Sequence, residues 1–236
     1  MILVPVKNLS GAKQRLASLL DQKLRTELAQ AMLHDVLSTL AAWSDNINSD
    51  NINKARPEVA VVSSDPFAVE LAREYEFEII PDPVNPGETG AIQMATQLCV
   101  DRGVASTLVI PADIPLVQSW ELAEILKQAP AEGSVLVPAA DGRGTNAAYR
   151  SPAALFPLRF GNDSFKPHHA AAQATNKPCV VLRLPGIAVD VDSPEDLQHL
   201  VSLPGETRAQ RLARKWGIDA RVGRALLPVQ PRSGDL

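Results

Sequence analysis

Three aspartates stand where strands of this chain are expected to end. Asp190 and Asp192 close an apolar run, Ile187 to Val191, directly before a predicted helix. Because residues i and i+2 of an extended chain point to the same face, both carboxylates can aim at one point. Asp113 follows another apolar run, Thr107 to Ile110, and ligands bind at the carboxyl edge of open parallel sheets. Carboxylates and phosphate oxygens are ligands of Mg²⁺, so this pattern indicates a magnesium site beside a phosphorylated ligand.

Helix capping is the alternative role for these acids. Ser193, Pro194 and Asp196 already offer an N-cap, a proline at the first helical position and an acid in the first turn. Capping therefore does not require Asp190, although Asp192 could share in it. An aspartate pair with one residue between is a common pattern, so the other motifs must decide between the two roles.

A basic segment follows the first predicted strand, Ile2 to Val6. Lys7, Lys13 and Arg15 lie around the start of a short helix that we expect over Ala12 to Leu20. A helix N-terminus with such cations could hold a triphosphate and offset the charge that develops on a leaving pyrophosphate. The segment lacks the Walker A pattern, and a solvated basic turn is the alternative.

Two glycine-containing segments could approach a ligand closely. Residues 141 to 147 match a dinucleotide-binding pattern in form, but that pattern must open a helix, and Pro152 follows too soon. We interpret the segment as a loop in which Thr145 and Asn146 donate hydrogen bonds to a ligand.

The second of these segments runs from Phe160 to His168. Gly161 and Ser164 could offer a backbone N–H and a hydroxyl to a phosphate or a carboxylate. His168 lies beside a helix predicted over Ala170 to Ala174, and a lone histidine there is more often structural than catalytic.

Apolar runs alternate with helical patterns along the whole chain, which predicts a mostly parallel sheet flanked by helices. The other predicted strands are 59 to 62, 78 to 80, 135 to 137 and 179 to 184, and the other helices 24 to 40, 66 to 72, 91 to 100, 120 to 127, 194 to 200 and 208 to 216.

The chain of 236 residues is expected to form one α/β domain over 1–204. Within it, 44–57 is predicted to be a polar insertion loop, because it carries a duplicated Ser-Asp-Asn-Ile-Asn sequence. Residues 205–236 are predicted to be a C-terminal extension, a helix followed by an extended tail. The helix is expected to pack on the domain or on a second subunit.

Composition excludes several classes of protein. A net charge of −4 and a pI near 5.6 argue against a nucleic-acid binder. Two distant cysteines, Cys99 and Cys179, form neither a disulfide framework nor a zinc pattern. We expect no membrane span and no signal peptide, since the opening apolar run is short, and therefore a cytoplasmic location.

Taken together, the segments resemble the 2-phospho-L-lactate guanylyltransferase family, which acts in deazaflavin coenzyme biosynthesis. The order and spacing of the motifs along almost the whole chain carry this resemblance. They are Val4 to Lys7 with Ala12 to Leu16, Ala112 to Leu116, Asp141 to Asn146, Phe160 to His168, Asp190 to Leu197, and Gly223 with Arg224.

The resemblance implies a nucleotidyltransferase domain of the GT-A type that transfers GMP from GTP, with two Mg²⁺ ions, to a small phosphorylated carboxylate. The acceptor would be phosphoenolpyruvate, 3-phospho-D-glycerate or 2-phospho-L-lactate. The family is also the basis for expecting a homodimer. The residues implied are Asp113, Asp190 and Asp192 for the metal, the same three with Lys13 for catalysis, Pro5, Val6, Lys7, Lys13, Arg15, Gly87, Thr89 and Ala91 for the nucleotide, and Thr145, Asn146, Gly161, Ser164 and His168 for the acceptor.

Two departures from the family pattern bear on the substrates. Glu88 and Thr89 replace a leucine and an asparagine before a helix, where a base or ribose contact is expected. Arg143 replaces a commoner glycine and adds a cation beside the acceptor loop. A GT-A glycosyltransferase, in which an aspartate pair also holds a metal, and a non-catalytic nucleotide-binding domain are the alternatives.

Overall fold

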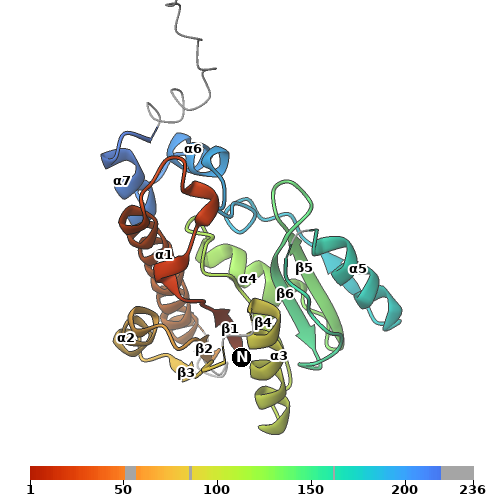
Figure 1. Cartoon of the computed structure of the whole chain (residues 1–236). Helices are drawn as coiled ribbons and strands as arrows, with labels where there is room; N and C mark the ends of the chain where they lie inside the picture. Colours follow the sequence, from red (N-terminus) through yellow and green to blue (C-terminus); the bar gives the residue numbers. More distant parts are fainter. Residues whose placement is uncertain (51–56, 85–86, 162, 219–236) are drawn as a thin grey trace, which may run out of the picture.

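The fold is a single twisted sheet covered by helices on both faces (Figure 1). The computed structural model describes residues 1–50, 57–84, 87–161 and 163–218, and for 45–50 the backbone alone. The described sheet has seven strands in the order β3-β2-β1-β4-β6-β5-β7. Their bounds are β1 Ile2–Pro5, β2 Val59–Val62, β3 Glu78–Ile80, β4 Thr107–Val109, β5 Gly133–Pro138, β6 Thr145–Ser151 and β7 Cys179–Val181.

Parallel pairing dominates this sheet, as the sequence predicts. β1 pairs in parallel with β2 and β4, and β5 with β7, whereas β6 runs antiparallel to both β4 and β5. The four residues of β1 and the four of β2 are all buried, as expected for strands that are covered on both faces. The sheet is therefore mixed, with one reversed strand inside it.

The helices divide between the two faces of the sheet and a third core beyond its edge. Residues of α1, α2 and α4 pack with one face, and residues of α3 and α5 with the other. The N-terminal part of α1 packs with α6 and α7 in the third core. The helix bounds are α1 Gln22–Asp50, α2 Pro66–Glu74, α3 Glu88–Asp101, α4 Ser119–Gln128, α5 Phe165–Ala174, α6 Pro194–Ser202 and α7 Arg208–Lys215.

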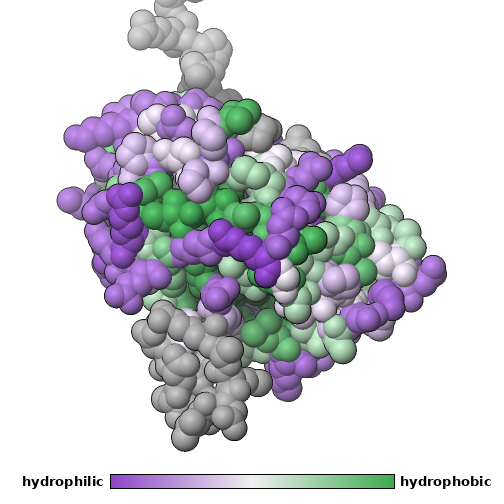
Figure 2. Space-filling model, turned by 90° about the horizontal axis from the view of Figure 1, so that it is seen from below, coloured by the Kyte–Doolittle hydropathy of each residue, from purple (hydrophilic) through white to green (hydrophobic). Residues whose placement is uncertain are grey.

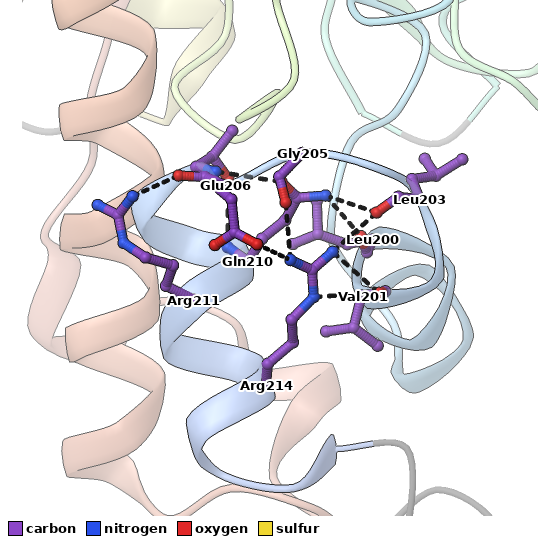
Figure 3. Close-up of polar contacts among 9 residues, drawn as sticks. Leu200, Val201, Leu203, Gly205, Glu206, Gln210, Arg211 and Arg214 are labelled. Atoms are coloured by element: carbon purple, nitrogen blue, oxygen red, sulfur yellow. Dashed lines mark hydrogen bonds and ion pairs between the residues drawn. The ribbon is translucent and has the colours of Figure 1, made fainter.

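Helix α7 contacts the middle of α1 and the C-terminal end of α6. The Asp35 carboxylate of α1 accepts hydrogen bonds from the backbone N–H groups of Arg208 (2.8 Å) and Ala209 (2.9 Å), at the first turn of α7. The Arg214 guanidinium donates to carbonyls at the end of α6 and in the loop after it (Figure 3), which satisfies groups that a helix terminus leaves open. These acceptors are the carbonyls of Val201, Leu203 and Gly205.

Three local predictions are wrong. The helix expected over residues 12–20 is replaced by two short 3₁₀ turns, Leu9–Gly11 and Gln14–Leu16. The strand expected over 187–191 is instead a turn at 185–188 followed by extended chain. The first part of the predicted insertion loop is helical, because α1 continues to Asp50, while 51–56 lie outside the described residues.

The structure adds one strand that was not predicted and confirms one predicted helix. Strand β6 was not predicted, since Thr145 and Asn146 were assigned to a loop. The helix predicted in the C-terminal extension is confirmed as α7, which shares a core with α1 and α6. The extended tail and the Gly223–Arg224 segment lie outside the described residues.

The two ends of the parallel strands present different surfaces. Figure 2 views the side of their N-terminal ends, where hydrophobic residues gather in a band that polar residues cross. No helix among the described residues is long and apolar enough to cross a membrane. The segments that carry the predicted site residues lie at the other, C-terminal end of the strands (Figure 1).

Candidate active site

A left-handed backbone conformation at Lys13 shapes the basic segment. Lys13 has φ 56° and ψ 42°, a conformation that is uncommon outside glycine and that ends a right-handed helix. The Asn8 side chain closes the preceding turn by accepting from the Ser10 backbone N–H at 2.9 Å. The predicted helix fails for these reasons, and the turns carry the Lys13 side chain into the protein.

The Lys13 ammonium group joins two of the predicted carboxylates. Its Nζ lies 2.8 Å from Oδ2 of Asp113 and 2.7 Å from Oδ1 of Asp192, and its side chain is only 9% exposed. Burial alone would lower the pKa of Lys13, but the two carboxylates outweigh that effect and raise it above its ordinary value. Lys13 is therefore a fixed positive charge between the end of β4 and the segment before α6.

A buried glutamate shapes the turn that leads to the aspartate pair. Oε1 of Glu121 accepts from the Gly186 backbone N–H at 2.7 Å, and Oε2 accepts from that of Gln118 at 2.9 Å. A Cβ on Gly186 would lie 2.3 Å from the Leu116 carbonyl oxygen, so a larger residue does not fit there. Glu121 was not predicted from the sequence, because its role depends on contacts between distant segments.

The chain after this turn is held to its neighbours by a few separate hydrogen bonds and not by the regular pairing of a β-strand. The Val191 N–H donates to the Asp113 carbonyl at 3.1 Å. Nδ2 of Asn146 donates to the Ile187 carbonyl and to Oδ1 of Asp190, both at 3.0 Å. Asp113, Asp190 and Asp192 are thus brought to one place, as the sequence predicts, although no strand carries the last two.

Crowding of carboxylates makes this region electrostatically unusual. Burial, with smaller contributions from Asp113 and Asp192, raises the pKa of Asp190 to about 6. Burial and the same two aspartates raise the pKa of Glu88 to about 7. Burial opposes ionisation of Asp192 as well, but Lys13, Arg15 and Lys7 outweigh it and lower the pKa of that carboxyl. We call Glu88, Asp113, Asp190 and Asp192 the acid cluster.

The donor set of the acid cluster suits a divalent cation. Among the described residues, no three acidic, histidine or cysteine side chains are arranged as a metal site in their present positions, and Lys13 bridges Asp113 and Asp192. All the same, carboxylate oxygens are the ligands that Mg²⁺ prefers. A cation would offset both the burial and the neighbouring carboxylates that raise the pKa of Asp190. The residues therefore fit a magnesium ion by their chemistry.

Two cavities meet at the acid cluster. One, of about 350 Å³, is enclosed by residues of β6, the turn before it, the loop before α5 and the aspartate pair. The other, of about 510 Å³, is enclosed chiefly by residues 5–14. Both are lined by Glu88, Pro111, Asp113 and Asp192. The acid cluster is therefore the boundary between two compartments, which we call the β6 cavity and the N-terminal cavity.

Four of the residues predicted to bind the acceptor line the β6 cavity: Thr145, Asn146, Gly161 and Ser164. The first two lie in β6 and not in the loop that the sequence predicts: Thr145 pairs with Pro138 of β5, and Asn146 lies at an irregularity between this pair and the next. The Ser164 hydroxyl accepts from the Thr145 backbone N–H at 3.1 Å, which joins the two walls of the cavity.

His168 lies behind this wall. It is 1% exposed and does not line the β6 cavity. Nε2 accepts from the Arg159 backbone N–H at 2.7 Å, so Nδ1 bears the proton and donates to the Thr145 hydroxyl at 2.9 Å. Burial and the nearby Arg150 lower the pKa of His168 to about 4. The imidazole is therefore neutral and positions Thr145.

The residues predicted to bind the nucleotide fall into two groups. Pro5, Val6, Lys7 and Lys13 line the N-terminal cavity, whereas Arg15 lines the β6 cavity. Three others line neither cavity. Thr89 accepts from the Phe160 N–H at 2.9 Å, Ala91 is buried in the core, and Gly87 precedes α3. In their place α3 presents Glu88, the acid in its first turn, to both cavities.

Solved structures support the fold. The chain is similar to a protein of Desulfovibrio desulfuricans G20 described as a nucleotide-diphospho-sugar transferase (TM-score 0.72, 18% identity, 94% of this chain and 96% of that one). It is also similar to a nucleotidyl transferase of Methanothermobacter thermautotrophicus (TM-score 0.52, 16% identity, 91% and 99%). The predicted GT-A-like nucleotidyltransferase architecture is confirmed.

Sequence relatives are closer. The chain is 36% identical to the phosphoenolpyruvate guanylyltransferase of Roseiflexus castenholzii, over 91% of this chain and 93% of that one. It is 30% identical to the 3-phospho-D-glycerate guanylyltransferase of Colwellia psychrerythraea (86% and 91%) and to the 2-phospho-L-lactate guanylyltransferase of Methanothermobacter thermautotrophicus (94% and 93%). The family model described as guanylyl transferase CofC like matches residues 1–226. This chain therefore belongs to the CofC-like guanylyl transferase family of nucleotidyltransferases.

Proposed function

We propose that this protein transfers GMP from GTP to the phosphate of a small phosphorylated carboxylate and releases pyrophosphate. The observation that carries the proposal is the pair of cavities that share Glu88, Asp113 and Asp192 of the acid cluster. Two substrates held on either side of this cluster of carboxylates can meet there, as group transfer requires. The names of the relatives supply the guanine nucleotide and the class of acceptor.

The N-terminal cavity is assigned to GTP. Its wall carries Lys7 and Lys13, and cations there stabilise the charge that develops on the leaving pyrophosphate. Lys13 is the fixed charge at the boundary of the two cavities. Arg15 lies on the other side of that boundary and lowers the pKa of Asp192, so it acts near the point of transfer.

The β6 cavity is assigned to the acceptor. Thr145, Gly161 and Ser164 offer hydroxyl and backbone groups that can hold phosphate or carboxylate oxygens. His168 fixes the Thr145 hydroxyl from behind. Asn146 donates to Asp190 at 3.0 Å and so holds that carboxylate toward the boundary.

The reaction is a direct displacement. An oxygen of the acceptor phosphate attacks the α-phosphorus of GTP, and the bond from that phosphorus to the bridging oxygen breaks. Pyrophosphate leaves with the electron pair, and a new phosphoanhydride remains. Because a phosphate monoester is largely dianionic near pH 7 (second pKa about 6), the attacking oxygen needs no general base. The acid cluster serves for charge and position.

Asp113, Asp190 and Asp192 would hold the divalent cation, Mg²⁺, one ion or two. A bound cation supplies charge neutralisation between two anionic substrates and polarises the α-phosphate. Lys13 bridges two of the three carboxylates, so it must share or give up these contacts when a cation binds. We further place the reaction in deazaflavin coenzyme biosynthesis in the cytoplasm, with a homodimer as the expected assembly.

The test is to incubate the protein with GTP, Mg²⁺ and each of the three acceptors separately, and to measure pyrophosphate. We expect turnover of at least one acceptor with GTP, and little or none with ATP or CTP. Release of a nucleoside diphosphate from a sugar nucleotide, with no pyrophosphate, would instead indicate a glycosyltransferase. Nucleotide binding without turnover of any acceptor would contradict the proposal and indicate a non-catalytic domain.

A further inference from the structure

An ion pair joins two loops at the rim of the β6 cavity. Nε of Arg143 lies 2.5 Å from Oδ1 of Asp163, and Nη2 lies 3.2 Å from Oδ2, which is a two-point contact. Arg143 belongs to the turn between β5 and β6, and Asp163 to the loop before α5. Both residues line the β6 cavity. The pair therefore stands where an acceptor must pass or rest.

The backbone of Arg143 is held by hydrogen bonds at its N–H and at its carbonyl, so its side chain can exchange partners while the turn keeps its position. The Arg143 N–H donates to Oδ1 of Asp141 at 2.8 Å, and its carbonyl accepts from the Phe165 N–H at 2.8 Å. The two side chains are 63% and 59% exposed, and ion pairs as exposed as this one contribute little to stability. A ligand anion can therefore replace Asp163 at the guanidinium at low cost.

The position of Arg143 sets what that anion can be. Arg15 and Arg143 are positively charged residues in the lining of the β6 cavity, and Arg15 lies near Asp192 at the cavity boundary. Arg143 precedes Asn146, which contacts Asp190, by three residues, so the two α-carbons are at most about 10 Å apart. An acceptor with its phosphate at the acid cluster would point its other end toward Arg143.

We propose that Arg143 selects the acceptor by binding its carboxylate, in exchange for Asp163. This inference rests on the proposed function. A carboxylate separated from the phosphate-bearing carbon, as in 3-phosphoglycerate, reaches toward the rim where the guanidinium stands. In phosphoenolpyruvate and 2-phospholactate the two groups share one carbon, so the carboxylate stays nearer Thr145 and Ser164. Arg143 thus favours the longer acceptor.

The test compares Arg143→Gln, Asp163→Asn and the double variant by steady-state kinetics with all three acceptors. Arg143→Gln is expected to raise KM for 3-phosphoglycerate about 10-fold or more, as expected for the loss of a charged hydrogen bond. Its KM for GTP and for the two compact acceptors should change less than about 3-fold. Asp163→Asn should lower KM for 3-phosphoglycerate, because the competing carboxylate is gone. In the double variant that gain should disappear.

Arg73→Gln is the matched control, because Arg73 forms a similarly exposed ion pair with Glu70 on α2, and neither residue lines the β6 cavity or the N-terminal cavity. It should leave every KM unchanged. Equal changes for all three acceptors, or a rise in KM with Asp163→Asn, would show that the pair is only a structural clamp and would overturn the inference.

A second measurement separates this inference from the proposed function. The affinity for 3-phosphoglycerate with Mg²⁺ present is measured by calorimetry, without turnover. Weaker binding in Arg143→Gln than in the wild type supports the inference whatever the reaction proves to be. Failure of the wild-type protein to bind 3-phosphoglycerate overturns it, even if phosphoenolpyruvate is turned over and the proposed function stands. Absence of pyrophosphate with every acceptor counts against the proposed function.

Discussion

The N-terminal cavity and the β6 cavity border the same acid cluster but are built in different ways. One continuous stretch, residues 5–14, encloses most of the N-terminal cavity. The β6 cavity gathers its lining from a β-turn, the start of β6, the loop before α5 and the segment before α6. A single segment can be read from the sequence as a motif. Walls assembled from distant segments depend on how strands pair and which side chains are buried between them.

Substitution of a residue in the acid cluster should have the largest effect on turnover, because both cavities border this cluster. Asp192→Asn removes a charge that Lys13 contacts at 2.7 Å and that lines both cavities. We expect turnover to fall by about 10³-fold, the size of loss seen when a group stabilising transition-state charge is removed. Pyrophosphate release measures it, and circular dichroism checks that the variant folds.

Asp101→Asn, at the end of α3 and in neither cavity lining, is the control for this variant. It should keep wild-type turnover. If Asp192→Asn also retained full activity, the assignment of the acid cluster to the transfer step would be wrong.

Substitution of one residue in either cavity should change the KM of one substrate and not that of the other. Lys7→Gln, in the N-terminal cavity, is expected to raise KM for GTP about 10-fold and to leave the acceptor KM unchanged. Ser164→Ala, in the β6 cavity, is expected to do the reverse, since it loses a neutral hydrogen-bonding group and should cost about 3- to 10-fold. Initial rates with one substrate varied at a time give both constants.

Crossed effects would contradict this division. If Lys7→Gln raised the acceptor KM and left that of GTP alone, the assignments of the two cavities would have to be exchanged. Ser202→Ala at the end of α6, outside both cavity linings, is the control for serine removal and should change neither constant.

The smallest effect concerns stability and not turnover. The pKa of Asp190 is raised to about 6 from an ordinary 3.8, so the folded protein prefers the protonated carboxyl. Stability from that group is present below about pH 4 and is lost as pH rises through 6. Asp190→Asn should therefore raise Tm at pH 7.5 by about 3 °C, after allowance for partial exposure, and not at pH 4.

Thermal unfolding at the two pH values, without divalent cations, measures this difference. Added Mg²⁺ should narrow it, because a bound cation would stabilise the wild-type carboxylate and not the amide. A variant that is less stable than the wild type at pH 7.5 would show that the hydrogen bond from Asn146 outweighs the cost of burying the Asp190 carboxylate beside Asp113 and Asp192.

Much of the fold could be predicted because its signals are local. Apolar runs indicated β1, β2 and β4, and apolar residues that recur every four positions indicated α1. Strand β6 was missed because Thr145 and Asn146 lack a strong strand pattern, and the pairing of β6 with β5 depends on the tertiary structure. The run from Ile187 to Val191 shows the opposite case, an apolar pattern that is buried without a ladder.

The site was predicted in its charges more than in its geometry. The three aspartates and Lys13 could be found because acids and bases at strand ends are visible in the sequence. The left-handed backbone of Lys13 could not, since contacts with Asp113 and Asp192, distant in sequence, accompany it. Glu121 was not predicted, and Glu88 was noted only as a departure from the family pattern, because only the folded chain gives each of them its surroundings.

The contacts of α7 bear on the order in which parts of the protein can fold. Asp35 is buried and takes its backbone partners from Arg208 and Ala209, near the other end of the described chain. Before Arg208 and Ala209 have left the ribosome, the Asp35 carboxylate lacks these two backbone partners and must stay hydrated. Helix α1 therefore cannot pack fully at this point. The carbonyl groups of Val201 and Leu203 at the end of α6 likewise lack their donor until Arg214 is in place. We therefore expect the packing of α1 and α6 to be completed only after α7 has formed.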